Sequence, residues 1–135
     1  MRIRSAKKED FGGIIRLAEA YGLDYSDMES DAYWVAVDGK KIIGIIGLKR
    51  HPECAELCSL GVDEGFRGRG IGQRLVRALL KKAGGEIYLA TIIPAFFQKF
   101  GFEKAPLVPA SMIKKSDWCL GCRRELCTVM GRKHP

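Results

Sequence analysis

A glycine-rich run between two regular segments constrains this chain most. Residues 62–72 read VDEGFRGRGIG, with glycines at positions 68, 70 and 72. The segment before it, 55–62, has the length of a strand, and the segment after it, 71–83, carries apolar residues at helical spacing. Glycines let the backbone approach a ligand closely, and a helix start directs its free N–H groups and positive dipole end at the same place. We therefore expect an anion to bind at this loop.

Two common glycine-loop motifs do not fit the run. A P-loop needs a glycine, four residues and then Gly-Lys-Ser or Gly-Lys-Thr, and the sequence contains no such string. The dinucleotide fingerprint needs Gly-x-Gly-x-x-Gly, whereas this chain has Gly-x-Gly-x-Gly. The pattern that remains is Arg-x-x-Gly-x-Gly at residues 67–72.

This remaining pattern resembles the coenzyme A loop of the GNAT family of N-acetyltransferases. A second stretch, AFFQKFGF at residues 95–102, is similar to the later signature of that family, a short helix that ends in a Gly-Phe turn. The resemblance covers essentially the whole chain. It implies an α/β (α+β) GNAT fold, in which a mixed central β-sheet has helices on both faces and a parallel strand pair splays apart around the pantetheine arm of acetyl-CoA.

Length and composition favour a single domain over residues 1–135. The chain has 135 residues, 47% of them hydrophobic and 29% charged, without repeats or long linkers. Its longest apolar stretch, 42–48, is far shorter than the roughly 20 residues that span a bilayer, and the charged N-terminus lacks a signal-peptide core. We expect a soluble, cytoplasmic protein with no membrane partner.

The net charge of +7 is spread along the chain. No aromatic residues interleave with the basic ones to form a base-stacking platform, so a solvated surface that attracts an anionic cofactor and substrate is favoured over nucleic-acid binding. The sequence leaves a homodimer open.

The order of expected elements follows from periodicity and turn signals. Strands are expected at 2–5, 33–37, 41–48, 55–62 and 86–90, and helices from a cap at Ser5 or Asp10 to about Tyr21, over 71–83 and over 94–100. Asp38-Gly39 is a strong hairpin signal, and 25–32 reads as a polar linker or short helix. A right-handed crossover through the long helix makes the strands at 55–62 and 86–90 parallel.

Cofactor contacts are assigned by the resemblance. The backbone N–H groups of the loop form the expected pyrophosphate cradle, and Arg67 adds its charge. The backbone of Leu60 and Val62 pairs with the pantetheine arm, and the Val62 N–H polarises the thioester carbonyl. The cradle consists of Arg67, Gly68, Arg69, Gly70, Ile71, Gly72 and Gln73.

Glu56 is the candidate general base. It stands six residues before Val62, where histone-acetylating members of the family carry a glutamate that removes the amine proton. Period-two alternation places Glu56, Cys58, Leu60 and Val62 on one face of the strand. The alternative is a glutamate at a strand start that makes a surface ion pair. Glu53 is a weaker candidate for the base.

The general acid is less evident. Many family members place a tyrosine at the second aromatic position of the later signature, and here that residue is Phe97. A phenyl ring cannot donate a proton, so Ser59, Thr91, Tyr88 or solvent would have to serve the leaving thiolate.

A cysteine-containing segment at about 116–130 holds Cys119, Cys122 and Cys127. These thiols are compatible with zinc, with a redox bond or with ordinary unligated cysteines. A fourth zinc ligand would come from His134, His51, Cys54 or Cys58.

The tail, together with Phe97, also resembles the stand-alone N-acetylglutamate-synthase-like group of the family. The function that this resemblance implies is transfer of the acetyl group of acetyl-CoA to the amine of a small substrate, such as the amino acid glutamate. The alternatives are an acetyl-CoA-binding sensor with a metal- or redox-responsive tail, and an acetyltransferase for a protein amino terminus or lysine. Candidate cations for a substrate carboxylate are Lys49, Arg50, Lys99, Lys114 and Arg16.

Overall fold

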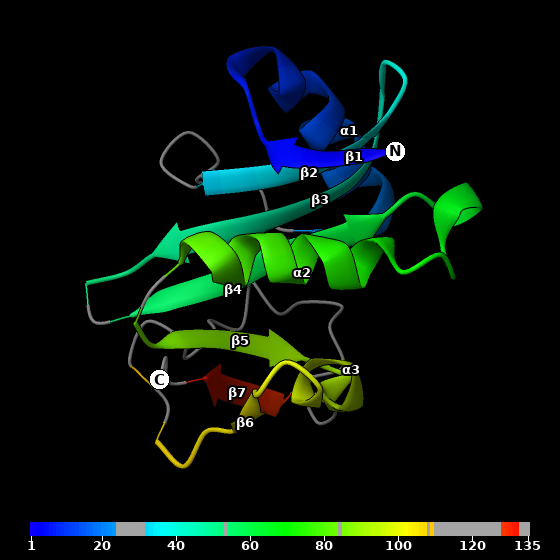
Figure 1. Ribbon diagram of the computed structural model, residues 1–135. Coiled ribbons are helices and arrows are strands. Elements are labelled where there is room, and N and C mark those ends of the chain that lie inside the picture. Colours follow the sequence, from blue (N-terminus) through cyan, green and yellow to red (C-terminus); the bar gives the residue numbers. More distant parts are fainter. Residues whose placement is uncertain (24–31, 53, 84, 108, 110–127, 133–135) are drawn as a thin grey trace. The chain divides into compact units, whose positions relative to one another are not determined.

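A computed structural model describes residues 1–23, 32–52, 54–83, 85–107, 109 and 128–132 (Figure 1). The helices and strands in chain order are β1 (Arg2–Ser5), η1 (Lys8–Asp10), α1 (Phe11–Tyr21), β2 (Ala32–Asp38), β3 (Lys41–Arg50), β4 (Ala55–Val62), η3 (Glu64–Phe66), α2 (Ile71–Lys82), β5 (Ile87–Thr91), α3 (Pro94–Gln98), β6 (Glu103–Lys104) and β7 (Thr128–Arg132). The chain divides into two compact units, Met1–Lys49 with Leu57–Gly84 and Arg50–Glu56 with Gly85–Pro135.

The first unit is built on the antiparallel strands β1, β2 and β3. Arg2 to Ser5 pair with Val37 to Trp34, and β2 turns into β3 at the predicted Asp38-Gly39 hairpin, where Gly39 has φ +62°. A positive φ costs glycine little because it has no Cβ, so this turn closes without strain. The hairpin and both of its strands are confirmed.

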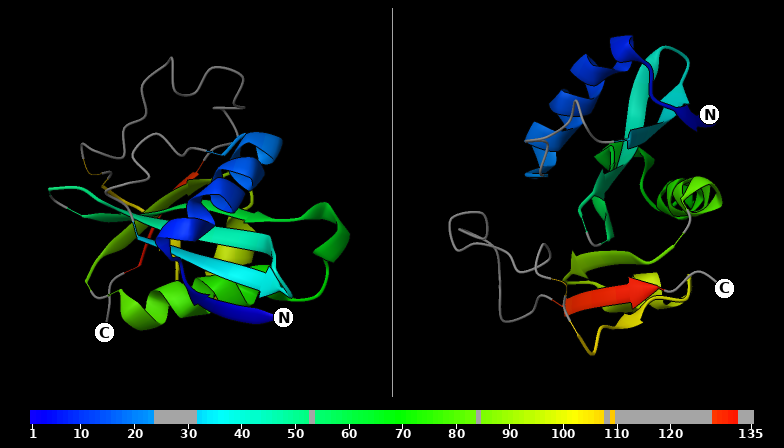
Figure 2. Two further views of the ribbon diagram at one scale, coloured as in Figure 1. Left: turned by 90° about the horizontal axis from the view of Figure 1, so that it is seen from above. Right: turned by 90° about the vertical axis from the view of Figure 1, so that its left-hand side faces the viewer.

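Helices cover both faces of this part of the sheet, with α1 on one side and α2 on the other (Figure 2). On the α2 side, a Cβ on Gly44 would lie 3.0 Å from Leu75 and 3.3 Å from Ile71, so glycine lets the helix approach the strand closely. On the α1 side, the buried residues form one apolar cluster. Its members are Ile14, Leu17, Ala18, Tyr33, Val35, Ile42 and Ile45.

The start of α1 differs from the prediction. Asp10 occupies the position before the helix, but its side chain makes no capping bond to it. The carboxylate instead accepts hydrogen bonds from Arg4 at 2.6 and 3.1 Å and from the backbone N–H of Lys7 at 2.6 Å. Asp10 is therefore the N-cap of α1, one of the two predicted positions, but its side chain does not bond to the helix because the Arg4 guanidinium and the Lys7 N–H take the carboxylate.

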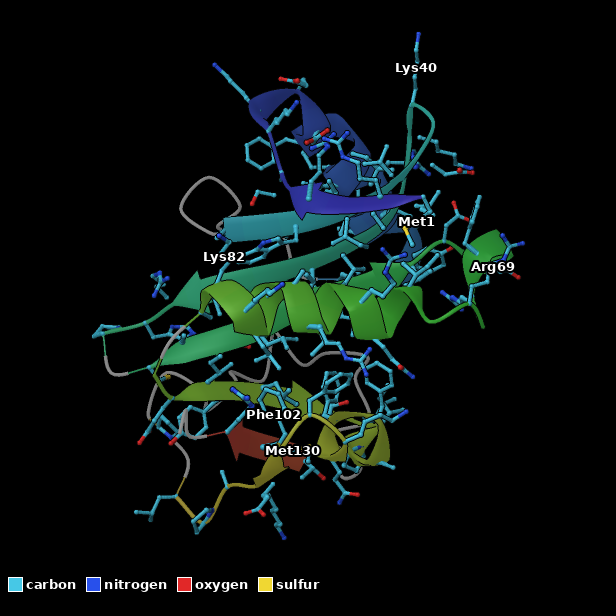
Figure 3. The ribbon with its side chains drawn as sticks, viewed as in Figure 1. Met1, Lys40, Arg69, Lys82, Phe102 and Met130 are labelled. Atoms are coloured by element: carbon cyan, nitrogen blue, oxygen red, sulfur yellow. The ribbon has the colours of Figure 1, made fainter. Side chains whose placement is uncertain are left out.

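The second unit contains β5, β6 and β7 with α3. Ala55 and Glu56, the first residues of β4, pair in parallel with Ile87 and Tyr88, so the predicted parallel relation is confirmed. Strand β7 then pairs antiparallel with both β5 and β6. The sequence analysis predicted neither β6 nor β7. Phe102 and Met130, each 1% exposed, belong to the apolar core of this unit (Figure 3).

Hydrogen bonding orders the strands β1-β2-β3-β4-β5-β7-β6. Strand β4 runs from Ala55 to Val62, and its first two residues are those that pair with β5. The mixed sheet of the predicted GNAT fold is confirmed. Among the described residues, no helix combines the length and the apolar character needed to cross a bilayer.

Candidate active site

The loop after β4 has the geometry of an anion cradle. Gly68 has φ +82° and Gly70 has φ +76°, a left-handed conformation that L side chains rarely adopt. A Cβ at either position would meet nothing within 4 Å, so the space in front of the loop is open. Gly70 stands immediately before α2 and has no side chain with which to cap it.

The first turn of α2 offers unpaired donors. The first hydrogen bond at the start of this helix runs from the Arg74 N–H to the Gly70 carbonyl at 3.1 Å. Within the part of the chain that the structure describes, the N–H groups of Ile71, Gly72 and Gln73 have no hydrogen-bond partner. Three free donors at the positive end of a helix of twelve residues favour a phosphate ligand.

Arg67 and Tyr21 dock the loop on the end of α1. The Arg67 Nε donates to the carbonyl oxygen of Val62 at 3.0 Å, and the guanidinium lies 4.7 Å from the centroid of the Tyr21 ring. The Tyr21 hydroxyl accepts a hydrogen bond from the Glu64 N–H at 2.8 Å. The structure thus places the Arg67 charge beside the loop, while Arg69 extends from its tip (Figure 3).

Within strand β4, Ser59 has a left-handed backbone conformation, with φ +55°. A Cβ on Gly47 would lie 3.1 Å from the Cys58 Sγ and 2.9 Å from Tyr33, a member of the apolar cluster under α1. Cys58 therefore faces the α1 side of the sheet. A Cβ on Gly61 would meet Leu23, which packs against the same cluster. Residues 58 and 61 therefore face one side, which strict alternation forbids.

The prediction that Leu60 and Val62 share a face with Glu56 and Cys58 is wrong. The left-handed residue at position 59 rotates the backbone and reverses the alternation from that point on. Sequence alone gave no signal for this, because a left-handed serine inside a strand is rare.

Glu56 is 4% exposed, so its carboxylate is buried and does not lie on the surface. Its Oε1 lies 2.8 Å from the Nε2 of His51, and the two side chains are 6% and 17% exposed. The sequence analysis considered His51 only as a metal ligand. Glu53 lies outside the described residues.

The candidate general acids differ in the hydrogen bonds that their hydroxyl groups make. Phe97 is buried, with its ring packed against Phe102. The Tyr88 hydroxyl donates to Glu86 at 2.9 Å, and this hydrogen bond, with burial second, raises the pKa of Tyr88. Thr91 Oγ1 accepts the N–H of Ile93 at 2.9 Å, which leaves the hydroxyl proton available. The Tyr88 proton is therefore already held by Glu86, whereas the Thr91 hydroxyl can still donate a hydrogen bond.

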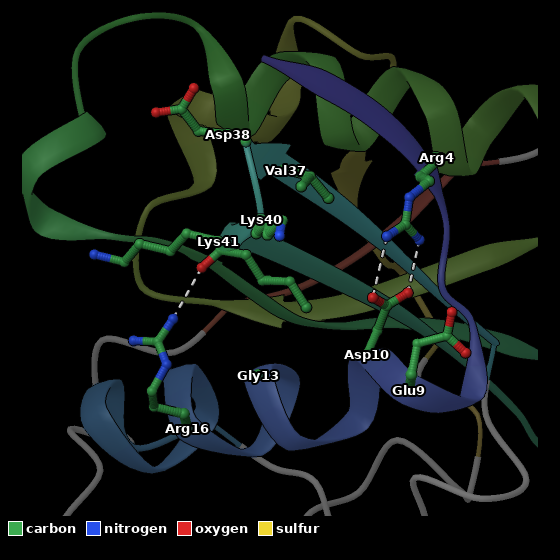
Figure 4. A pocket seen from close by; sticks show the side chains of 11 residues that line it. Arg4, Glu9, Asp10, Gly13, Arg16, Val37, Asp38, Lys40 and Lys41 are labelled. Carbon is green, nitrogen blue, oxygen red and sulfur yellow. Dashed lines mark hydrogen bonds and ion pairs between the residues drawn. The ribbon is translucent and has the colours of Figure 1, made fainter.

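A pocket of about 730 Å³ lies elsewhere in the first unit, between the start of α1, β1 and the β2–β3 turn (Figure 4). Two arginines of its lining are bonded within it: Arg4 to Asp10, and Arg16 to the Ile42 carbonyl at 2.9 Å. None of the predicted cofactor residues lines it. Arg16, a candidate substrate cation, belongs to this pocket.

The remaining candidates are placed as follows. Lys99 lies 5.4 Å from the centroid of the Phe96 ring, and Lys49 and Arg50 end β3. Lys114, Cys119, Cys122, Cys127 and His134 lie outside the described residues. Among the described residues, no three His, Cys, Asp or Glu side chains form a group that could hold a metal ion.

The family match agrees with this geometry. The acetyltransferase (GNAT) family matches residues 2–102, which include β4, the glycine loop, α2 and the Gly-Phe turn. The chain belongs to the GNAT family.

Individual relatives share the fold and part of the sequence. The mycothiol acetyltransferase of Corynebacterium glutamicum is 41% identical over 64 residues, 46% of this chain and 21% of that protein. The chain therefore spans about a fifth of the length of this relative. N-acetylglutamate synthase from Neisseria gonorrhoeae, complexed with coenzyme A and N-acetyl-glutamate, superposes with a TM-score of 0.76 at 19% identity, over 99% of this chain and 35% of that one. Rv2747 from Mycobacterium tuberculosis, in complex with CoA, gives a TM-score of 0.76 at 20% identity over 100% of both chains.

Proposed function

We propose that this protein is an acetyl-CoA-dependent N-acetyltransferase that acts on the amine of a small substrate, with an amino acid such as glutamate as the leading class. The observation that carries the proposal is the start of α2, where Gly68 and Gly70 leave open space and three backbone N–H groups lack partners among the described residues. These donors suit the pyrophosphate of coenzyme A.

The loop residues bind and orient the cosubstrate. The N–H groups of Ile71, Gly72 and Gln73 would hold the pyrophosphate. Arg67, at the start of the same loop, would add its positive charge beside that group. When bound, acetyl-CoA supplies an acetyl thioester. Holding this group beside the amine supplies much of the rate, because a bimolecular step becomes effectively unimolecular.

The backbone of β4 continues this binding surface in the proposal. The family resemblance assigns the end of β4 to the pantetheine arm, and each strand residue other than proline offers a backbone N–H donor and a C=O acceptor. The N–H and C=O groups of Leu60 and Val62 are therefore suited to pair with the amide-containing pantetheine arm. In this proposal the Val62 N–H donates to the thioester carbonyl and stabilises negative charge that develops on its oxygen.

Glu56 serves as the general base. Acetyl transfer needs a neutral amine, and a carboxylate that is 4% exposed is shielded from bulk water. Solvent donates the proton to the leaving thiolate, directly or relayed through the Thr91 hydroxyl, which regains a proton from water, since the Tyr88 hydroxyl is bonded to Glu86. Support for an amino-acid acceptor comes from the sequence resemblance to the N-acetylglutamate-synthase-like group, with which the fold similarity agrees.

The test is release of coenzyme A thiol from acetyl-CoA in the presence of an amine panel. The panel contains glutamate, aspartate, glutamine, a free lysine and a peptide with an unblocked amino terminus. We expect thiol release that depends on the presence of an amino acid. Glu56→Gln should lower turnover about a hundredfold, which is the scale of general-base catalysis, and leave the affinity for coenzyme A unchanged. Binding of acetyl-CoA without turnover of any amine would support the sensor alternative instead, and turnover of the peptide alone would support the protein acetyltransferase.

A further inference from the structure

An aspartate stands at the entry to the glycine loop. Asp63 directly follows Val62, the last residue of β4, and its side chain is 18% exposed. We infer that Asp63 is a positioning residue for coenzyme A: its carboxylate fixes the turn that leads into the glycine loop, and Lys41 neutralises its charge so that it does not repel the phosphate. This inference rests on the proposed function. Asp63, Lys41 and the glycine loop all belong to the first compact unit.

Backbone hydrogen bonds hold Asp63 on the sheet and begin the turn. Its N–H donates to the carbonyl oxygen of Ile43 in β3 at 2.7 Å. Its own carbonyl oxygen accepts a hydrogen bond from the N–H of Phe66, the last residue of η3, at 2.8 Å. Asp63 is therefore the residue at which the chain leaves the sheet and enters the loop.

Both carboxylate oxygens of Asp63 have partners. Oδ1 accepts a hydrogen bond from the N–H of Gly65 at 3.1 Å, and Oδ2 lies 3.5 Å from the Nζ of Lys41, the first residue of β3. The bond from Gly65 satisfies one of the backbone donors that the start of a helix leaves without an intrahelical partner. The same bond lowers the pKa of Asp63. Burial opposes this shift, and the charges of Lys41 and Arg16 add to it, so the group is a carboxylate at neutral pH.

The turn that Asp63 fixes decides where the cradle begins. The N–H of Arg67 donates to the carbonyl oxygen of Glu64 at 3.4 Å, so η3 leads directly to the first residue of the cradle. Without the bond from the Asp63 side chain to Gly65, the turn has more conformations open to it in the free protein. Coenzyme A would then have to order the loop as it binds, and this ordering lowers its affinity.

The negative charge of Asp63 lets an experiment separate position from charge. A carboxylate repels an anionic ligand, so removal of the charge alone should strengthen coenzyme A binding. Removal of the acceptor of the Gly65 N–H should weaken it. Asparagine keeps a side-chain oxygen that accepts this N–H but carries no charge, whereas alanine has neither the oxygen nor the charge.

The experiment measures the dissociation constant of coenzyme A by calorimetry for Asp63→Ala, Asp63→Asn and Asp38→Ala. The last variant is the control, because it removes one acidic group from the end of β2. We expect Asp63→Ala to bind about fivefold more weakly than the parent, Asp63→Asn to recover that loss, and Asp38→Ala to show no loss. Urea midpoints establish that each variant is folded. A folded Asp63→Ala that binds as tightly as the parent, or an Asp63→Asn as weak as Asp63→Ala, would overturn the inference.

A second pair of variants tests the neutralising lysine. Lys41→Met and Lys40→Met each remove one positive charge from adjacent positions, and only the first removes the partner of Oδ2. We expect Lys41→Met to weaken coenzyme A binding about threefold more than Lys40→Met, and this difference to disappear when each is combined with Asp63→Asn. Equal effects of the two lysine variants on the parent background would overturn the role given to Lys41.

The backbone amide of Gly65 gives a readout that needs no ligand. Its rate of hydrogen exchange, measured by NMR, should rise in Asp63→Ala and stay near the parent rate in Asp63→Asn. An unchanged exchange rate in Asp63→Ala would contradict the inference. If the parent protein does not bind coenzyme A, the proposed function fails and this inference fails with it. If the parent binds coenzyme A and folded Asp63→Ala binds it equally well, this inference alone fails.

Discussion

Arg67 reaches back along the chain to Val62, donating from Nε to the carbonyl oxygen at 3.0 Å. The same guanidinium lies over the ring of Tyr21, at 4.7 Å from its centroid. The glycine loop after β4 is thereby fastened both to the end of β4 and to the end of α1. Arg67 also belongs to the same loop as Ile71, Gly72 and Gln73, whose N–H groups have no partner among the described residues. The first two predictions concern Arg67 and Tyr21.

Replacing Arg67 by alanine should weaken coenzyme A binding by about tenfold or more, because hydrogen bonds to charged groups contribute roughly 1.5–3 kcal/mol. Isothermal calorimetry measures the dissociation constant. Arg2→Ala, which removes one positive charge from β1, is the matched control. An equal loss of coenzyme A affinity in Arg67→Ala and Arg2→Ala would show that Arg67 acts only through the net charge of the protein.

Tyr21→Phe should weaken coenzyme A binding by about fivefold, because it removes the acceptor of the Glu64 N–H while keeping the ring that Arg67 covers. Calorimetry again gives the affinity, and Tyr88→Phe, whose hydroxyl donates to Glu86, is the control. An unchanged affinity in folded Tyr21→Phe would mean that this contact does not organise the loop.

Gly70→Val should abolish measurable coenzyme A binding, because the side chain enters the space in front of the loop. A positive φ strains any β-branched residue, so the variant will also lose stability, by about 1–3 kcal/mol. Gly39→Val has the same backbone strain in the hairpin turn, with φ +62° and open space around the Cβ. If Gly70→Val remains folded and binds as tightly as Gly39→Val, the loop assignment is wrong.

The parts of the fold that periodicity and turn chemistry determine were predictable from sequence. Strand β4 begins and ends where expected, at Ala55 and Val62, and the Asp38-Gly39 turn joins β2 to β3. Strand β7 was missed because Thr128–Arg132 is short and contains Gly131, so alternation is not visible. Its formation depends on β5, a partner distant in sequence.

The parts of the candidate site that depend on backbone conformation were predictable from the sequence. The parts that depend on tertiary contacts were not. Glycines at 68 and 70 indicated the cradle, since their conformational freedom is a property of the residue itself. The shift of alternation at Ser59 and the pair of His51 with Glu56 depend on how the turn and the sheet close. Tyr21 marked the expected end of its helix, and nothing in the sequence indicated that its hydroxyl supports the loop.

Acid stability should depend on Asp10. The hydrogen bond from Arg4 lowers the pKa of Asp10 in the folded protein. Burial opposes this shift, and the hydrogen bond from the Lys7 N–H adds to it. The pair therefore stabilises the fold above the unfolded pKa of about 3.9, and this contribution is lost as the pH falls through the lower folded value. Asp10→Asn should have a lower urea midpoint than the parent at pH 7, and the difference should shrink below about pH 4. A difference that stays constant over this range would contradict the linkage.

The most direct test of the central claim is mass spectrometry of the amine after incubation with acetyl-CoA and the parent protein, with released thiol measured in the same reaction. The account predicts one acetyl group on the amino nitrogen of the acceptor for each thiol released, with the rates of both lowered about a hundredfold in Glu56→Gln. Thiol release with no acetylated amine, from any member of the panel, would show hydrolysis in place of transfer and would contradict the account.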